Sequence, residues 1–129
     1  MGKGYLIDTN VISHLFANRL PESGRDFVYD VVNNEFLISV VEEIEVLTYH
    51  ETPGKIPLVE EFVSLATILP LDEKVKNKAI DLRRTQRKLK LADAIIAATA
   101  LVYGLTIITN NTRDFKNISG LDIIDPHLL

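Results

Sequence analysis

The stretch LADAIIAATALVYGLTIIT, residues 91–109, decides the fold. Its first thirteen residues carry a single charge, Asp93, and they are followed by Gly104, a residue type that commonly ends helices. The run LTIIT after this glycine has the composition of a strand buried on both faces of a sheet. The stretch therefore predicts a buried helix over Leu91–Tyr103 and a strand over Leu105–Thr109, and not one membrane-spanning helix.

The rest of the chain repeats this alternation, with Pro and Gly residues between the elements. The other predicted strands are Gly4–Ile7, Glu35–Ser39, Thr67–Leu69 and Asp122–Ile124. The other predicted helices are Val11–Asn18, Arg25–Asn33, Val40–His50, Leu58–Ala66 and Glu73–Arg87. This order predicts one α/β domain, residues 1–129: a three-layer α/β/α sandwich around a mainly parallel sheet of about five strands. The apolar runs LTIIT and ILPL (68–71) are both expected to be buried on two faces.

Composition narrows the class of protein. Apolar residues make up 47% and charged residues 25% of the 129 positions, as in ordinary globular domains. The absence of cysteine excludes disulfides, thiolate zinc sites and cysteine nucleophiles. With no signal-peptide pattern at the N-terminus, we expect a cytoplasmic protein without a membrane segment. The net charge of −4 argues against a protein that coats nucleic acid by bulk attraction.

Acidic residues from separate segments are predicted to meet at one edge of the sheet. In a parallel sheet, the carboxyl ends of strands and the N-termini of the following helices share an edge, where ligands bind. Asp8 ends the first strand, Asp93 lies in the first turn of the helix over 91–103, and Asp114 follows LTIIT in the loop TNNTRDF. The helix after the second strand adds three more acids in its first turns: Glu42, Glu43 and Glu45.

Each aspartate also has a structural explanation. Asp8 can cap the following helix, Asp93 can stabilise a helix N-terminus, and Asp114 can belong to an ordinary polar loop. None of these roles explains the convergence, because carboxylates that meet repel one another unless a cation neutralises them. Oxygen ligands alone suit Mg²⁺ or Mn²⁺. A histidine zinc site is not indicated, because the three histidines are scattered along the chain: His14, His50 and His127.

Helix periodicity leaves the choice of glutamate open. The sequence Ser39-Val40-Val41-Glu42 has the form of a capping box, which predicts that the second strand turns directly into a helix. On that helix Glu42 is predicted to point away from the apolar face, whereas Glu43 and Glu45 lie on its opposite borders. The residues that define this face are Val40, Val41, Ile44, Leu47 and Thr48.

Four segments together resemble the PIN-domain family, and within it the VapC-type ribonuclease toxins of toxin–antitoxin pairs. They are LIDTNVIS (6–13), ISVVEEIEVL (38–47), KLADAIIAATA (90–100) and TNNTRDF (109–115). The resemblance runs from residue 5 to about residue 124, and it implies a Mg²⁺- or Mn²⁺-dependent endoribonuclease. Its catalytic, metal-binding acids would be Asp8, Glu45, Asp93 and Asp114, with Glu45 preferred over Glu43. Weaker matches place polar, substrate-binding residues at Asn10, Thr109 and Asn111.

The resemblance also implies an RNA substrate, a small antitoxin partner and a homodimer. The first two helices carry more apolar residues than one core face needs: Val11, Leu15, Phe16, Phe27, Val28 and Val31. Eight of the fourteen basic residues fall between Lys74 and Lys90. They form either a solvated helix face or, as a hypothesis, an RNA-binding surface that includes Arg84 and Arg87.

Two departures from the family pattern stand out. Glu42 occupies a position where relatives more often have threonine, and RTQRKLK (84–90) lacks a glycine that many relatives carry.

Other α/β classes fit poorly. A phosphoacceptor module would need a second acid beside Asp8 and a lysine after the last strand, and an Asp-x-Asp phosphatase would need an acid at Asn10. The remaining alternative is a PIN-like domain that binds RNA or protein without cutting it.

Overall fold

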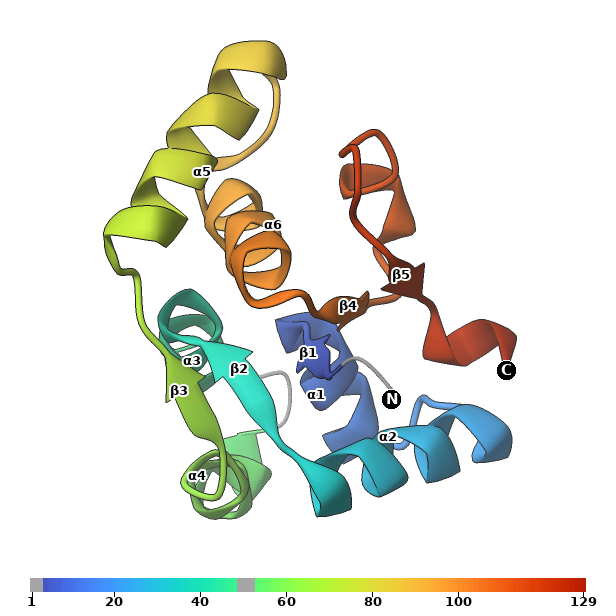
Figure 1. The fold of residues 1–129 in the computed structure, drawn as a ribbon. Helices are drawn as coiled ribbons and strands as arrows, with labels where there is room; N and C mark the ends of the chain where they lie inside the picture. Colours follow the sequence, from blue (N-terminus) through green and yellow to red (C-terminus); the bar gives the residue numbers. More distant parts are fainter. Residues whose placement is uncertain (1–3, 49–52) are drawn as a thin grey trace.

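The computed structural model describes residues 4–48 and 53–129, which form a sheet covered by helices on both faces (Figure 1). Parallel pairing joins β4 to both β1 and β5, and β2 to β3. Because β1 also contacts β2, the strands lie in the order β3-β2-β1-β4-β5, with the assigned pairing divided into three plus two. The strands are β1 (Tyr5–Ile7), β2 (Leu37–Ser39), β3 (Thr67–Leu69), β4 (Thr106–Ile108) and β5 (Ile123–Ile124). The predicted α/β/α sandwich and its parallel sheet are confirmed.

Six α-helices and three short 3₁₀ helices connect these strands in the described parts of the chain. The α-helices are α1 (Thr9–Phe16), α2 (Glu22–Asn34), α3 (Val40–Thr48), α4 (Ile56–Val63), α5 (Glu73–Thr85) and α6 (Leu91–Tyr103). The 3₁₀ helices are η1 (Pro53–Lys55), η2 (Thr112–Asp114) and η3 (Pro126–Leu128). Among the residues described, no helix has both the length and the apolar character needed to cross a membrane.

Two hydrophobic cores lie on opposite faces of the sheet, because successive strand residues point to opposite sides. One core contains Leu6, Leu37 and Ile107 together with α5 and α6. The other contains the next residue of each strand, Ile7, Ile38 and Ile108, together with α1, α2, α3 and α4. The consecutive residues at these positions are therefore both apolar, which explains the pair Ile107 and Ile108 in the run LTIIT.

Helix α6 spans the predicted residues and packs deeply in the first core. It presents small side chains to its neighbours, so the backbone can approach the sheet and α5 closely. The residues at most 1% exposed are Ala94, Ile96, Ala97, Ala98, Thr99 and Ala100. Gly104 ends the helix in the left-handed conformation (φ 67°), as the sequence predicts.

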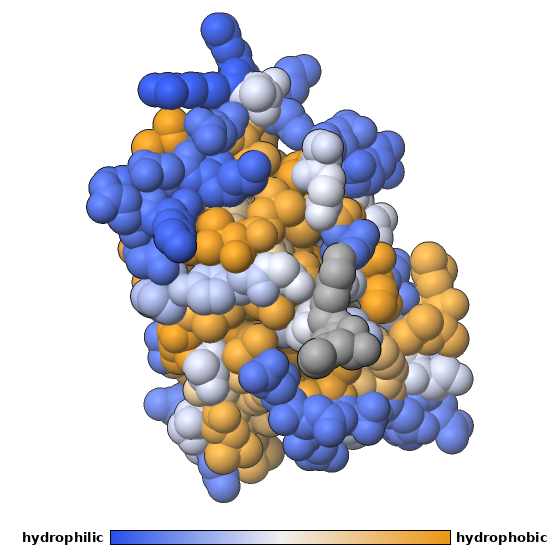
Figure 2. Space-filling model, viewed as in Figure 1, coloured by the Kyte–Doolittle hydropathy of each residue, from blue (hydrophilic) through white to orange (hydrophobic). Residues whose placement is uncertain are grey.

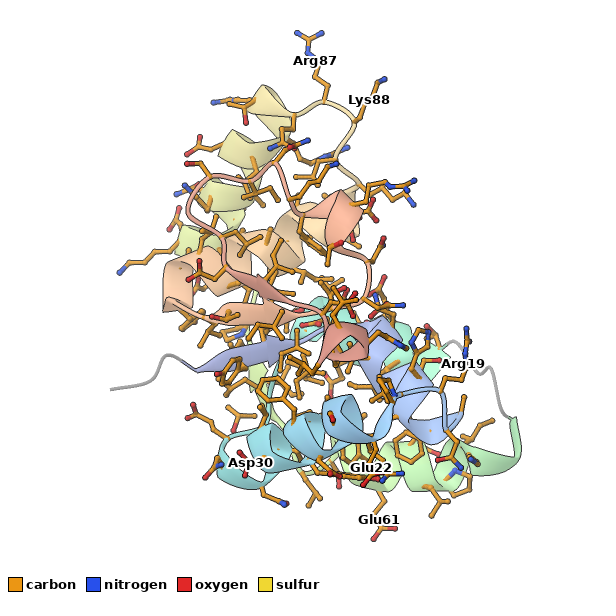
Figure 3. The ribbon with its side chains drawn as sticks, turned by 90° about the vertical axis from the view of Figure 1, so that its right-hand side faces the viewer. Arg19, Glu22, Asp30, Glu61, Arg87 and Lys88 are labelled. Atoms are coloured by element: carbon orange, nitrogen blue, oxygen red, sulfur yellow. The ribbon has the colours of Figure 1, made fainter. Side chains whose placement is uncertain are left out.

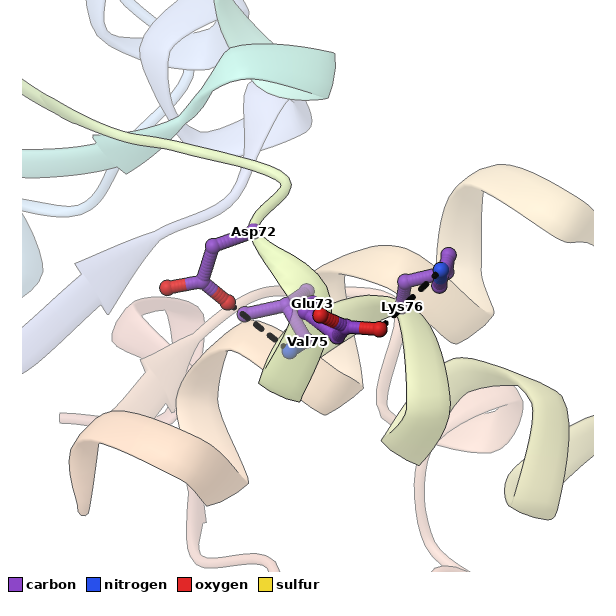
Figure 4. A network of polar contacts seen from close by, with 4 residues as sticks. All are labelled: Asp72, Glu73, Val75 and Lys76. Carbon is purple, nitrogen blue, oxygen red and sulfur yellow. Dashed lines mark hydrogen bonds and ion pairs between the residues drawn. The ribbon is translucent and has the colours of Figure 1, made fainter.

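Other helix boundaries differ from the predicted ones for local reasons. Helix α1 begins two residues earlier than predicted because Asp8 caps it, and α2 begins directly after Pro21. The cap of α5 is Asp72, whose Oδ1 accepts a hydrogen bond from the Val75 N–H at 2.9 Å (Figure 4). Helix α5 ends at Thr85, before the predicted Arg87. Helix α4 is shifted toward the N-terminus by two to three residues. The predicted end of the third helix at His50 lies outside the described residues.

The prediction that ILPL is buried on both faces is wrong. Strand β3 lies at the edge of the sheet, where it pairs with β2 alone, so Thr67 is exposed and both Ile68 and Leu69 are half-buried. The matching prediction for LTIIT is confirmed, because β4 lies between two strands and all three of its residues are buried. An apolar run thus reveals a strand without revealing its place in the sheet.

The predicted apolar surplus on the first two helices is also wrong. Val11, Leu15, Val28 and Val31 are at most 8% exposed and belong to the second core. The two phenylalanines pack inside the domain as well, through edge-to-face ring contacts of Phe16 with Phe62 and of Phe27 with Tyr5. These residues therefore give no support for a homodimer.

Gly24 allows α2 to approach η3 closely, and replacing it should destabilise the fold. A Cβ atom at this position would lie 1.9 Å from the Pro126 carbonyl oxygen. We expect Gly24→Ala to lower the free energy of unfolding by about 1–3 kcal/mol, the usual cost of overpacking. In an open helix the same change is favourable by about 0.5–1 kcal/mol. Gly54→Ala is the matched control, because nothing lies within 4 Å of its Cβ position. Urea unfolding of both variants tests this, and a stabilised Gly24→Ala would contradict it.

Candidate active site

Asp8 lies where the order of the strands reverses. The chain leaves β1 toward β2 and β3, then returns across the sheet to place β4 on the other side of β1. Asp8 follows β1 directly, and its N–H donates to the Ile108 carbonyl of β4 at 2.9 Å. Sites in open α/β sheets form at this kind of reversal. The fold therefore places Asp8 where a ligand site is expected.

The Asp8 carboxylate is buried and held by three hydrogen bonds. Its Oδ1 accepts from the Thr9 N–H at 2.9 Å, which caps α1. Its Oδ2 accepts from Thr109 Oγ1 at 2.8 Å and from Asn10 Nδ2 at 3.0 Å. Asn111 belongs to the same set, because its N–H donates to Thr109 Oγ1 at 2.9 Å. The three polar residues that the resemblance places near the site are thus all linked to Asp8.

Glu45 joins Asp8 through Thr9. Thr9 Oγ1 donates to Glu45 Oε1 at 3.0 Å and so fixes α3 against the start of α1. Asp8 and Glu45 line one hollow of about 510 Å³, which Glu43 does not line. The other residues around it are Thr9, Asn10, Ser13, His14, Arg19 and Thr48.

Asp93 and Asp114 line a second hollow of about 330 Å³. Asp93 lies in the first turn of α6, and Asp114 ends η2, where it accepts a hydrogen bond from the Asn111 side-chain amide. The remaining residues of this hollow are Gln86, Lys88, Leu89, Lys90 and Arg113. Three cations therefore surround these two acids.

Arg84 and Arg87 lie elsewhere. They line a groove of about 570 Å³ between α5 and α6, with Arg83 and Lys76, around apolar residues that include Ile80 and Leu91. Figure 2 shows apolar side chains among hydrophilic ones on the side of the molecule that carries these two helices. The structure thus brings the four predicted acids into two hollows and leaves the two predicted arginines outside both.

The acids influence one another electrostatically across the two hollows. Burial raises the pKa of Asp8 from 3.8 to about 6, with hydrogen bonds from Thr109 and Thr9 opposing the rise and the charges of Asp93 and Glu45 adding to it. Burial also raises the pKa of Asp93, and the charges of Asp114 and Glu45 act in the same direction against Lys90. The four acids therefore form one electrostatic system.

Helix α3 begins with the predicted capping box but buries a different face. The Ser39 N–H donates to Glu42 Oε1 at 2.8 Å, and the Glu42 N–H donates to Ser39 Oγ at 3.2 Å. The predicted apolar face is wrong, because Glu42 and Val46 are buried while Ile44 is 58% exposed. The capping box draws the Glu42 side chain back toward the end of β2, so this side of the helix faces inward.

The donor chemistry fits a hard divalent cation. Within residues 4–48 and 53–129, no three His, Asp or Glu side chains are arranged to hold a metal ion jointly. Mg²⁺ in proteins usually keeps several waters and takes only one or two carboxylates directly. The hollow that Asp8 and Glu45 line holds both of these carboxylates, and a cation bound there would favour the charged form of the buried Asp8. The residues present therefore fit Mg²⁺ or Mn²⁺ bound largely through water.

Two residues beside these acids, Thr9 and Arg113, were not predicted from the sequence, whereas Lys88 and Lys90 belong to the basic cluster 74–90 that was considered as an RNA-binding surface. Arg113 precedes Asp114 in the recognised segment TNNTRDF, and Lys88 and Lys90 flank the buried Leu89 on the way to Asp93. Position along the chain contains a signal for Arg113, because it directly precedes Asp114 in a segment already assigned to the site. Thr9 has no such signal, since its partner on α3 lies 36 residues away.

Comparison with known proteins shows the family of the chain. The family model for the PIN domain matches residues 5–121, and the chain belongs to that family. It is 31% identical to ribonuclease VapC1 of Rickettsia felis, over 94% of this chain and 95% of that protein. It is 30% identical to a tRNA(fMet)-specific endonuclease VapC of Shigella flexneri, over 91% and 93%.

Solved structures are similar over the whole domain. A toxin–antitoxin complex from Klebsiella pneumoniae contains a chain with a TM-score of 0.77 and 28% identity, covering 95% of this chain and 98% of that one. A DNA-bound VapBC from Salmonella typhimurium gives a TM-score of 0.78 at 25% identity, covering 97% and 99%. The resemblance drawn from the four sequence segments is confirmed at the level of the family.

The raised pKa of Asp8 predicts a pH-dependent stability in metal-free protein. The folded state holds the Asp8 proton more tightly than the unfolded state, so the associated stability is fully present below pH 3.8 and is lost as pH rises through about 6. The two pKa values correspond to a loss of about 3 kcal/mol. Asp8→Asn cannot titrate, and we expect a shallower fall in its unfolding free energy between pH 4 and 7. Urea unfolding with a chelator measures this, and parallel profiles for the two proteins would count against it.

Proposed function

We propose that this chain is a divalent-metal-dependent endoribonuclease, the toxin of a cytoplasmic toxin–antitoxin pair that a small antitoxin protein inhibits. The observation that carries the proposal is the buried Asp8 carboxylate at the strand reversal, fixed by Thr9, Asn10 and Thr109 and influenced by acids from other segments. A purely structural cap would not need these further acids. The nuclease names of the relatives and the toxin–antitoxin complexes among the solved structures support the same function.

The four acids have different roles in the proposed reaction. Bound among them, Mg²⁺ or Mn²⁺ would polarise the scissile phosphate and lower the pKa of a water. Asp8 and Asp93 are the principal ligands in this proposal, and Glu45 and Asp114 complete the set or orient the attacking water. Thr9 holds the Glu45 carboxylate in place by its hydrogen bond.

The three polar residues near the acids orient them toward substrate. Asn10 and Thr109 donate to one oxygen of Asp8 and leave its carboxylate a single orientation. Asn111 donates from its backbone to Thr109 and from its side chain to Asp114. One set of hydrogen bonds at the end of β4 and the start of α1 therefore connects the acids of the two hollows. The residues that make it are Asn10, Thr109 and Asn111.

RNA phosphates are proposed to bind the cations beside Asp93 and Asp114. Lys88 and Lys90 flank Leu89, which is 7% exposed and packs in the first core. The loop is held by Arg83 Nε, which donates to the Leu89 carbonyl at 3.2 Å, and by Gln86 Nε2, which donates to the Asn117 carbonyl at 2.9 Å. The lysines are thus presented by an anchored loop, in the hollow that also contains Arg113.

The alternative of a PIN-like module that binds without cutting is less well supported. It would need no grouping of four acids around a strand reversal, and a stable binding surface would favour cations there instead. A homodimer remains part of the proposal by analogy with the family, although the apolar residues of α1 and α2 are used within the domain.

Substitution of the principal ligands tests catalysis. We expect Asp8→Asn and Asp93→Asn to lower cleavage of total cellular RNA by more than about 100-fold, since the loss of a ligand should exceed the effect of losing an outer partner. Chelation of wild type should have the same effect, and added Mg²⁺ or Mn²⁺ should restore it. Asp30→Asn is the control, an exposed acid on α2 at the other end of the molecule from Arg87 (Figure 3). Equal cleavage by all variants, or cleavage that survives chelation, would contradict the proposal.

The position of the RNA can be read from the salt dependence of binding. In an Asp8→Asn background, combined Lys88→Ala, Lys90→Ala and Arg113→Ala should weaken RNA binding. The slope of log affinity against log salt should fall by about 2, because three phosphate contacts at about 0.7 each are lost.

The pair Arg84→Ala and Arg87→Ala provides the comparison, measured by fluorescence anisotropy across a salt series. We expect a smaller change from this pair, because both arginines line the α5–α6 groove. A larger change from the pair than from the triple variant would place the RNA along that groove instead.

A further inference from the structure

Glu42 is a carboxyl group outside the four predicted acids, and its surroundings leave one atom unexplained. The side chain is fully buried, and its Oε1 accepts from the Ser39 N–H at 2.8 Å. Its Oε2 is buried and has no hydrogen-bond partner in the described structure. A buried polar atom without a partner costs free energy and calls for an explanation.

Capping α3 does not supply that explanation. A capping box needs one acceptor atom on the residue at this position, and Oε1 alone fills that role. Glutamine would serve equally well and would bring no charge into the interior, where an uncompensated charge is costly. The second carboxyl oxygen of Glu42 therefore remains without a structural task.

The position of Glu42 in the fold is close to the acids of the site. The Glu42 carboxyl accepts a hydrogen bond from Ser39 at the end of β2. Strand β2 contacts β1, and Asp8 directly follows the end of β1. One turn further along α3, Glu45 is bonded to Thr9 at the start of α1. After burial itself, the charge of Asp8 is the largest influence that raises the Glu42 pKa. Glu42 is thus held at the end of the strand next to the one that Asp8 follows, close enough for the two carboxyl groups to interact.

We propose that Glu42 is a fifth acid of the cation site, to which it adds a carboxylate and the unpartnered acceptor atom Oε2. The inference rests on the proposed function as a metal-dependent nuclease. A divalent cation at Asp8 gives the Glu42 charge a partner that the protein itself does not provide. The contribution of Glu42 is tighter binding of the cation.

The isosteric variant Glu42→Gln separates this role from capping. Its amide oxygen can keep the bond to the Ser39 N–H, so metal-free protein should unfold at the same temperature as wild type or a higher one. Its affinity for Mn²⁺ should fall by about 10-fold or more. Isothermal titration calorimetry in the absence of RNA measures this affinity, because no cleavage then takes place. The gain in melting temperature on adding Mn²⁺ should shrink accordingly. Glu43→Gln is the matched control, with the same chemical change on the neighbouring residue, and should bind Mn²⁺ as wild type does.

Ser39→Ala gives the converse result. It removes the hydroxyl half of the capping box and leaves the Glu42 carboxyl, so it should lower the melting temperature of metal-free protein while Mn²⁺ affinity is kept. Equal Mn²⁺ affinity of Glu42→Gln and wild type would overturn the inference. So would an equal loss of affinity in Glu42→Gln and Ser39→Ala, because the start of the helix would then be responsible.

The failure of the proposed function gives a different pattern. Wild type that binds neither Mg²⁺ nor Mn²⁺ would overturn both proposals together. Wild type that binds Mn²⁺, loses it in Asp8→Asn and keeps it in Glu42→Gln would overturn the inference about Glu42 alone.

Discussion

The burial of the Asp8 carboxylate at the edge of the sheet, with further carboxylates near it, is the constraint on which the rest of the site depends. The parallel sheet brings the ends of β1 and β4 together, and the packing of α3 and α6 adds acids from two more segments. The protein offsets part of the cost of burying Asp8 with three hydrogen bonds. Burial still raises the Asp8 pKa to about 6, so the remaining cost is one that a bound cation would relieve under the proposed function.

Features determined by local chemistry could be predicted from the sequence. Helix α6 was predicted with both of its ends, because a buried helix with small side chains and a left-handed glycine at its end depends on few outside influences. The capping box at Ser39 and Glu42 is local as well, and it is confirmed. The edge that collects Asp8, Asp93 and Asp114 follows from the alternation of strands and helices.

Features determined by distant neighbours could not be predicted. The buried face of α3 depends on its packing against α1 and β2. This packing buries the charged residue Glu42 and leaves the apolar residue Ile44 exposed, the reverse of what their hydrophobicity predicts. The edge position of β3 depends on the order of the strands, which no property of ILPL records. For the same reason, Arg84 and Arg87 could not be told apart from Lys88 and Lys90. These residues lie within seven positions of the chain, but they fall on different sides of α6.

The uneven distribution of charge has a consequence for how a polyanion meets this protein. Residues 74–90 hold eight of the fourteen basic residues and one acid, while the whole chain has a net charge of −4, so the remainder is strongly negative. Arg87 and Lys88 project from one end of the molecule, and Glu22, Asp30 and Glu61 lie toward the other (Figure 3). Such a charge dipole turns an approaching nucleic acid before contact, because one end attracts it and the other repels it. Encounters are thereby biased toward the end of the molecule nearest Asp93, in an orientation selected before any specific bond forms.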